Sequence, residues 1–295
     1  MLARFSKSSF PLLKRCLATT PYQHIRLEVD ESHIATLTIN RPEKKNAFSG
    51  VTIQELSSAL CSIDSDSSVR GLIIKGAGDY FCAGADLSWM KDTAKMNHDE
   101  IKADSMKLRT MLSRCDKLRI PTVAFVKGGC IGGGVGLSST VKNVVALPST
   151  WFLFSEVRLG IIPAVVSPFV LKRIGSAQCK RVMMIPERIT AADAYRIGLV
   201  DRIVESEEAM VQYEAEWRKL VKAGAPGAVR LVSDLIDAID GKSESEQGEV
   251  SVEMLCERRK SEEGKEGMNC FFQKTKPSWV KCFVSWTPLS IFEHP

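Results

Sequence analysis

Two glycine-rich segments decide the fold of this chain: GAGDYFCAGADL at residues 76–87 and GGCIGGGVGL at residues 128–137. Each follows a short apolar run that predicts a buried strand, at residues 72–74 and 123–126. Glycine lets a backbone approach a ligand closely and adopt torsions that other residues avoid. A helix that begins inside the second segment would point its free N–H groups and its positive end at such a ligand. Neither segment matches a dinucleotide or P-loop pattern, and on glycine content alone tight turns are the simpler interpretation.

The sequence around these segments alternates β-rich runs with helical patterns. Strands are expected at residues 34–39, 72–74, 123–126, 144–147 and 151–154, and helices at residues 51–63 and 101–118. This alternation indicates an α/β fold with crossover connections. After about residue 163, helices are expected at residues 176–185, 191–197, 206–223, 226–239 and 247–274. The chain therefore divides into an α/β core (21–205), a helical C-terminal region (206–280) and a tail (281–295).

The composition is that of a globular protein in a reducing compartment. With 295 residues, of which 44% are hydrophobic and 25% charged, the chain is long enough to bury a large core. Its nine cysteines are odd in number and include no CxxC pair, which favours buried thiols over disulfides. No run approaches the roughly 18 apolar residues of a membrane span. The four histidines show no metal-ligand spacing, so we expect neither a membrane nor a metal partner.

The first twenty residues have the composition of a mitochondrial transit peptide. They contain four basic residues and several serines, and no acidic residue precedes Glu28. Lys14 and Arg15 interrupt the apolar stretch that a secretory signal needs, and an unstructured cytosolic N-terminus is the alternative. We therefore expect a location in the mitochondrial matrix. Without these four charges, the formal net charge of +5 falls to +1 for residues 21–295, which gives no electrostatic reason to expect a nucleic-acid partner.

Six segments, in order and at suitable spacing, resemble the crotonase (enoyl-CoA hydratase/isomerase) superfamily. The glycine-rich segments resemble its two oxyanion-hole loops, and SEVRLGIIP at residues 155–163 resembles the segment that carries a catalytic carboxylate. The others are LTINRPEKKNAF (37–48), RITAADAYRIGLVDRIV (188–204) and ERRKSEEGKEGMNCFFQKTKPSW (257–279). The resemblance implies a spiral of ββα turns, a helical trimerisation region in a homotrimer or hexamer, and an acyl-CoA thioester substrate. Coenzyme A is then part of the substrate, and no resident cofactor is expected.

The resemblance also implies a set of site residues. The backbone N–H groups of Ala85 and Gly133 would donate to the thioester oxygen and stabilise an enolate, and losing one such donor typically costs about 10²–10³ in rate. Glu156 would be the catalytic acid and base, with its pKa raised by partial burial. Substrate binding is assigned to Lys44, Ala83, Asp86, Leu87 and Gly132. Lys44 and its neighbour Lys45 would meet the phosphates of coenzyme A, with a solvated basic loop as the alternative.

One position departs from the family pattern. Hydratases of this family typically use two glutamates, and the first of these maps onto Gly136, which has no side chain. A single carboxylate suffices to move a proton between two carbons, as in a double-bond isomerase, whereas hydration also needs a positioned water. Ser139 and Thr140, one helical turn after Gly136, are candidates to help Glu156 hold that water.

Three functions remain open on the sequence. Residues 155–170 together with GGGVGL resemble the methylglutaconyl-CoA hydratase-like branch associated with leucine degradation, which favours an enoyl-CoA or 3-methylglutaconyl-CoA hydratase. The single carboxylate keeps a Δ3-Δ2-enoyl-CoA isomerase as the alternative. A catalytically inactive family member that binds CoA esters or RNA is a third possibility. A nucleophilic role for Cys82 has no histidine nearby in sequence, so packing is its expected role.

Overall fold

The computed structural model describes residues 22–281 and is built on two sheets. The targeting segment predicted at residues 1–20 and the tail after residue 281 lie outside the described residues. The large sheet has the strand order β1-β2-β3-β4-β6-β9, and the small sheet has the order β5-β7-β8. The strands are β1 (Ile25–Val29), β2 (Ile34–Ile39), β3 (Gly71–Gly76), β4 (Thr122–Val126), β5 (Gly129–Ile131), β6 (Asn143–Ala146), β7 (Trp151–Leu153), β8 (Ile189–Thr190) and β9 (Arg202–Ile203).

Parallel pairing dominates the large sheet, where β2, β3, β4, β6 and β9 run side by side and β1 is antiparallel to β2. The chain winds as a spiral of ββα turns. It passes through β4 in the large sheet and β5 in the small sheet, returns through α4 (Gly133–Thr140), and then repeats this path through β6, β7 and α5 (Ser167–Met184). The expected α/β spiral is thereby confirmed.

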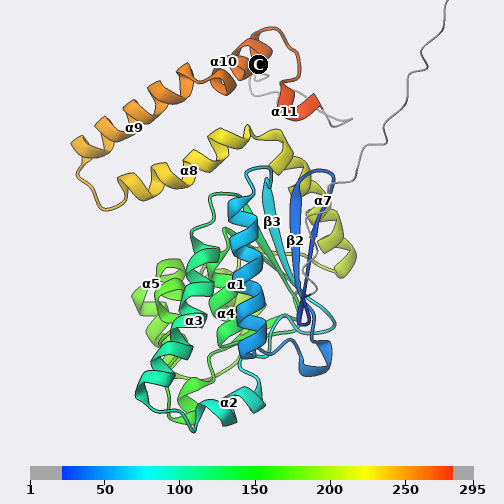
Figure 1. Ribbon diagram of the computed structural model, residues 1–295, viewed down its shortest axis with the longest axis vertical. Coiled ribbons are helices and arrows are strands. Elements are labelled where there is room, and N and C mark those ends of the chain that lie inside the picture. The colour runs from blue at the N-terminus through cyan, green and yellow to red at the C-terminus, as the bar shows by residue number, and fades with distance from the viewer. Residues whose placement is uncertain (1–21, 282–295) are drawn as a thin grey trace, which may run out of the picture.

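Helices cover both faces of the large sheet (Figure 1). Helices α1 (Gly50–Ser65), α3 (His98–Asp116), α4 and α5 pack on the face that receives Leu72 and Ile74. Helix α7 (Glu207–Ala223) covers the other face, where Ile73 joins Trp217 in a second core. Because successive side chains of a strand point to opposite faces, the apolar run in β3 serves both cores. The short elements are η1 (Pro42–Lys44), α2 (Leu87–Thr93), η2 (Glu156–Leu159) and α6 (Ala191–Arg196).

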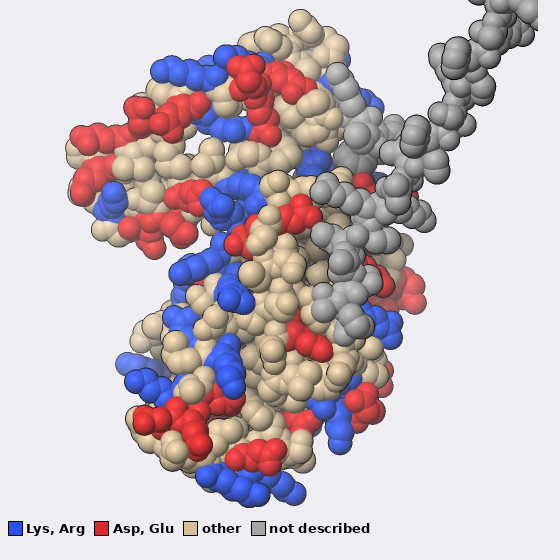
Figure 2. Space-filling view, viewed as in Figure 1, with Lys and Arg blue, Asp and Glu red and all other residues tan. Residues whose placement is uncertain are grey.

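Three helices form an arm that stands away from the core: α8 (Pro226–Ile239), α9 (Glu244–Lys260) and α10 (Glu262–Phe272). None of their residues is buried. Figure 2 shows a deep notch between the arm and the core, with acidic side chains gathered over α9. The single helix expected at residues 247–274 is wrong. Ser261 takes an extended conformation (φ −64°, ψ 155°), ends α9, and accepts a hydrogen bond from the Gly264 N–H as the cap of α10.

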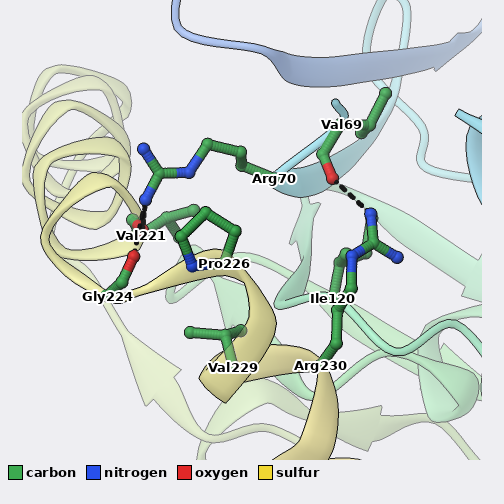
Figure 3. A pocket seen from close by; sticks show the side chains of 8 residues that line it. All are labelled: Val69, Arg70, Ile120, Val221, Gly224, Pro226, Val229 and Arg230. Carbon is green, nitrogen blue, oxygen red and sulfur yellow. Dashed lines mark hydrogen bonds between the residues drawn. The ribbon is translucent and has the colours of Figure 1, made fainter. Parts of the chain in front are cut away.

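Two arginines hold the joint where this arm leaves the core (Figure 3). Arg70, which precedes β3, donates to the carbonyls of Lys222 (3.0 Å) and Gly224 (2.6 Å), where α7 ends. It also donates to the carbonyl of Trp279 in α11 (Ser278–Lys281). Arg230 of α8 reaches back to the Val69 carbonyl at 2.9 Å. The cavity between them is only about 10 Å³, so this region is a packed joint and not a ligand site.

Candidate active site

The first glycine-rich segment runs alongside both the segment that follows β2 and the second glycine-rich segment. The N–H of Ala83 donates to the Lys45 carbonyl at 2.9 Å, and the N–H of Cys82 donates to the Gly129 carbonyl at 3.3 Å. Gly84 has φ +89°, a left-handed conformation that a side chain would strain. The chain therefore reaches Ala85 through a turn that requires glycine, and Ala85 remains exposed.

The second glycine-rich segment lies against the first. The N–H of Ile131 donates to the Cys82 carbonyl at 2.9 Å, and Cys82 forms a β-bridge with Cys130. A Cβ atom at Gly134 would lie 2.7 Å from the Cβ of Cys82, a separation that real Cβ atoms essentially never show. Only a glycine therefore allows the first turn of α4 to approach the first loop this closely. The two segments form one packed unit.

The two predicted oxyanion donors are both available for a ligand. Within residues 22–281, neither the N–H of Ala85 nor that of Gly133 donates to any protein acceptor. Gly133 begins α4, so its N–H belongs to the free first turn of a helix, where the dipole favours negative charge. Gly132, the residue before it, takes the unusual torsions φ 49° and ψ −110° that turn the chain into the helix. The helix expected to begin inside this segment does so at Gly133.

Glu156 lies beside this turn. It begins η2, directly after β7 and the Phe154-Ser155 link, and its side chain is half-buried. Its Oε1 would lie 2.9 Å from a Cβ atom at Gly132, and its Oε2 is buried without a hydrogen-bond partner among the described residues. Loss of hydration on burial raises the pKa of this carboxyl above its ordinary value. A half-buried carboxyl with a raised pKa therefore lies against Gly132, the residue that precedes the predicted Gly133 donor.

The position of the absent first glutamate is filled by packing. A Cβ atom at Gly136 would lie 2.8 Å from the Cβ of Val166, which is 3% exposed, and 3.5 Å from Leu112. A longer side chain has no room there unless Val166 moves. The two nearby hydroxyls are also engaged, because Ser139 donates to the Val135 carbonyl and Thr140 to the Leu137 carbonyl. Both hydroxyl hydrogens therefore already donate to carbonyls of α4, and neither is free to donate to a water beside Glu156.

The residues assigned to substrate binding lie in different surroundings. Lys44, at the end of η1, is exposed, and Ala83 is half-buried. Asp86 is buried and caps α2, where its pKa falls to about 2 because Ser88 donates to it and Arg41 pairs with it at 2.9 Å. Its carboxylate is therefore already engaged, in capping α2 and in pairing with Arg41. The remaining two are Leu87, which is 76% exposed, and Gly132, which is buried.

Other chemistries find little support in the described residues. Burial raises the pKa of Cys82 to about 12 and also raises that of Cys130, so both thiols stay protonated and pack as small side chains. No group of three or more His, Cys, Asp or Glu within residues 22–281 could hold a metal ion. Over the same residues, no helix combines the length and apolar character needed to cross a bilayer.

Three residues of this region were missed at the sequence level. Arg41, besides pairing with Asp86, donates to the Ala47 carbonyl at 2.7 Å. Asn46 is fully buried and donates to the carbonyls of Ala77 and Tyr80. Phe48 is 1% exposed and lies against the second glycine-rich segment. All three belong to the segment NRPEKKNAF, whose polar residues directly after a strand were the available signal.

Comparison with known proteins agrees with this geometry. The family model described as enoyl-CoA hydratase/isomerase matches residues 30–281. The crotonyl-CoA hydratase of Syntrophomonas wolfei is 32% identical over 88% of this chain and 98% of its own length. The short-chain-enoyl-CoA hydratase of Clostridium acetobutylicum is 32% identical over 83% of this chain and 94% of its own. A crystal structure of an enoyl-CoA hydratase from Shewanella pealeana superposes with a TM-score of 0.83, at 31% identity over 88% and 97% of the two chains.

The chain therefore belongs to the enoyl-CoA hydratase/isomerase family, within the crotonase superfamily. It is an enzyme of that family, with the α/β fold of its structural relatives.

Proposed function

We propose that this enzyme adds water to the double bond of an enoyl-CoA thioester, with Glu156 as its only catalytic carboxylate. The observation that carries the proposal is the position of Glu156. Its half-buried carboxyl with a raised pKa adjoins Gly132, the residue before the Gly133 donor. Enolate chemistry requires a base near the substrate and N–H donors without protein partners, and a raised pKa suits a carboxyl that both takes and returns a proton.

The proposed reaction divides the work between these groups. Ionised Glu156 takes a proton from water as the water oxygen bonds to C3 of the enoyl group. The electrons of the double bond then move onto the thioester oxygen, where the Ala85 and Gly133 N–H groups stabilise the negative charge. Glu156 returns its proton to C2, so the product gains one complete water and the enzyme ends unchanged.

The packing around Gly136 favours a second candidate, a Δ3-Δ2-enoyl-CoA isomerase. Val166 occupies the space where a second carboxylate would hold the attacking water. Isomerisation needs no water, because one base removes a proton from C2 and returns it to C4. Glu156 and the two N–H donors suffice for that reaction.

A panel of substrates separates these candidates. Purified protein would be incubated with crotonyl-CoA, longer 2-enoyl-CoAs, 3-methylglutaconyl-CoA and a 3-enoyl-CoA, while the absorbance of the conjugated thioester is followed. Loss of absorbance with the 2-enoyl thioesters supports the hydratase. A gain with the 3-enoyl-CoA alone supports the isomerase, and binding of every thioester without turnover supports an inactive binder of CoA esters.

We further propose short-chain or 3-methylglutaconyl-CoA as the substrate type. Two relatives named for crotonyl-CoA and short-chain enoyl-CoA support the first, and the resemblance of residues 155–170 supports the second. Relative kcat/KM values across the panel decide between them. A substrate whose acyl group carries a free carboxylate needs a cationic partner in the acyl site, so it would also show the stronger salt dependence.

Two proposals concern the setting of the enzyme. We propose a homotrimer or hexamer, supported by the unburied apolar side chains of the arm, such as Ile236, Leu255 and Phe272. Sedimentation of the full chain tests this, and a monomer at micromolar concentration would contradict it.

We also propose import into the mitochondrial matrix, supported by the basic, acid-free composition of residues 1–20. Import by isolated mitochondria, with and without these residues, tests the location.

A further inference from the structure

Phe48 contacts both segments that carry the oxyanion donors. It is 1% exposed and immediately precedes Ser49, the N-cap of α1. The mechanism proposed above assigns it no role, because it has no polar side chain. Its contacts with the two donors are nevertheless of different kinds, one through its backbone and one through its ring.

The backbone of Phe48 brackets the first donor. Its N–H donates to the Gly84 carbonyl at 2.7 Å, and its carbonyl accepts from the Asp86 N–H at 2.8 Å. These two bonds form a parallel β-bridge in which Ala85 is the residue opposite Phe48. Since successive peptide groups of an extended segment point in opposite directions, the N–H of Ala85 is turned away from Phe48, and it donates to no acceptor among the described residues.

The ring of Phe48 supports the second donor. A Cβ atom at Gly133 would lie 3.0 Å from Cδ2 and 3.3 Å from Cε2 of Phe48. The ring therefore packs directly against the α-carbon of Gly133, the residue whose N–H begins α4. A rigid aromatic ring at this point limits how far the first turn of α4 can shift relative to the bridge at Ala85.

The segment that carries Phe48 is itself held in place. Asn46 donates to two carbonyls of the first loop, at Ala77 (2.7 Å) and Tyr80 (2.6 Å). Its own side-chain oxygen accepts from the Arg41 N–H at 2.9 Å, and Arg41 in turn pairs with Asp86. Phe48 thus extends from a backbone that is anchored to the first loop, and its ring reaches Gly133 from there.

From these contacts we infer that Phe48 is a positioning residue that sets the distance between the two oxyanion donors. The inference rests on the proposed function, in which both N–H groups bind one thioester oxygen. Truncating the ring leaves the backbone bridge to Ala85 intact and removes the support of Gly133. Because the donors act most strongly on the enolate, the loss falls on kcat more than on substrate binding.

Activity and spectroscopy of ring-truncated variants test the inference. Phe48→Ala is expected to lower kcat by roughly 10–100-fold with KM little changed, since small misplacements of catalytic groups can cost about 10². Phe48→Leu, which keeps most of the volume, is expected to recover most of that loss. A bound aryl-enoyl-CoA chromophore should show its red shift, caused by polarisation of the thioester carbonyl, in the wild type and much less of it in Phe48→Ala.

Phe169→Ala is the matched control. Phe169 is 5% exposed in the same core, and its ring partner is Arg109. Both truncations should lower the melting temperature, but only Phe48→Ala should lower kcat and the red shift. If Phe48→Ala cannot be purified folded, the series Phe, Leu, Val at position 48 replaces it, and kcat should fall with side-chain volume.

The possible failures are distinguishable. A wild-type protein that turns over no enoyl-CoA and causes no red shift of the bound chromophore would contradict the proposed function itself. An active wild type whose Phe48 variants keep its kcat and red shift, while melting early like Phe169→Ala, overturns only the role of Phe48.

Discussion

The paired glycine-rich segments and the C-terminal arm differ in how closely their backbones are packed. Around Gly134, the backbone is packed so closely that even one methyl group has no room. Around Gly248 of α9, a Cβ atom would meet nothing within 4 Å. The first region carries the two N–H groups proposed to bind the thioester oxygen, and its packing leaves no room for a larger side chain at Gly134. The second presents apolar and acidic side chains outward, as a surface that forms contacts between molecules would.

The largest expected effect tests the chemistry of the packed region. Glu156→Gln should lower kcat by about 10²–10⁴-fold, because it removes the proposed acid and base next to Gly132 while keeping the side chain's shape. Thermal unfolding should change little, since Oε2 has no partner to lose among the described residues. Glu249→Gln, at an exposed position of α9, is the control and should keep full activity. Normal turnover by Glu156→Gln would rule out the assignment.

The second prediction sets one substitution in the packed segments against the same substitution in the arm. Gly134→Ala should destabilise the protein by about 1–3 kcal/mol through overpacking against Cys82 and lower kcat at least tenfold. Gly248→Ala should stabilise α9 by roughly 0.5–1 kcal/mol and leave kcat unchanged. Chemical denaturation and steady-state kinetics measure both. Equal changes in stability and kcat at the two positions would contradict the conclusion that the first region is closely packed and the second is not.

The joint between the regions gives a third prediction. Arg70→Met should cost about 1–3 kcal/mol, because the carbonyls at the end of α7 and in α11 lose a charged donor. Proteolysis of residues 226–272 should accelerate as the arm loosens. Arg259→Met, at an exposed position of α9, should change neither measurement. If Arg70→Met unfolds and digests like the wild type, Arg70 does not stabilise this joint.

The smallest effect is a pH dependence of stability. The pKa of Glu156 is raised in the folded protein, so the folded state holds its proton more tightly than the unfolded state does. The contribution of this group to stability therefore falls as pH rises from its unfolded pKa through its folded pKa. Glu156→Gln removes this dependence, and its melting temperature relative to wild type should be higher at pH 8 than at pH 4. A difference that stays constant with pH would contradict the raised pKa.

The sequence predicted the α/β organisation well because its signals are local. The apolar run of β3 and the apolar spacing of α1 each lie within one element. Strand β1 was missed although Ile25, Leu27 and Val29 alternate, and α2 was missed because it spans only Leu87–Thr93. The break at Ser261 was missed because a helical pattern continues on both sides of it.

The site was less accessible from sequence, since it is built from backbone. The roles proposed for Ala85 and Gly133 belong to their backbone N–H groups, so only the resemblance could assign them. The closure of the Gly136 position by Val166 joins residues thirty positions apart in the chain, and no local pattern reports such a contact. Phe48 was missed for a similar reason, because an apolar residue before an N-cap has the pattern of ordinary core.

The central claim is that the N–H groups of Ala85 and Gly133 converge on one thioester oxygen. A crystal structure of the enzyme with a non-reactive acyl-CoA tests it most directly. The account predicts both backbone nitrogens about 2.7–3.1 Å from that oxygen, with the Glu156 carboxyl facing the acyl carbons. A thioester oxygen bound by only one of these nitrogens, or by neither, would contradict it.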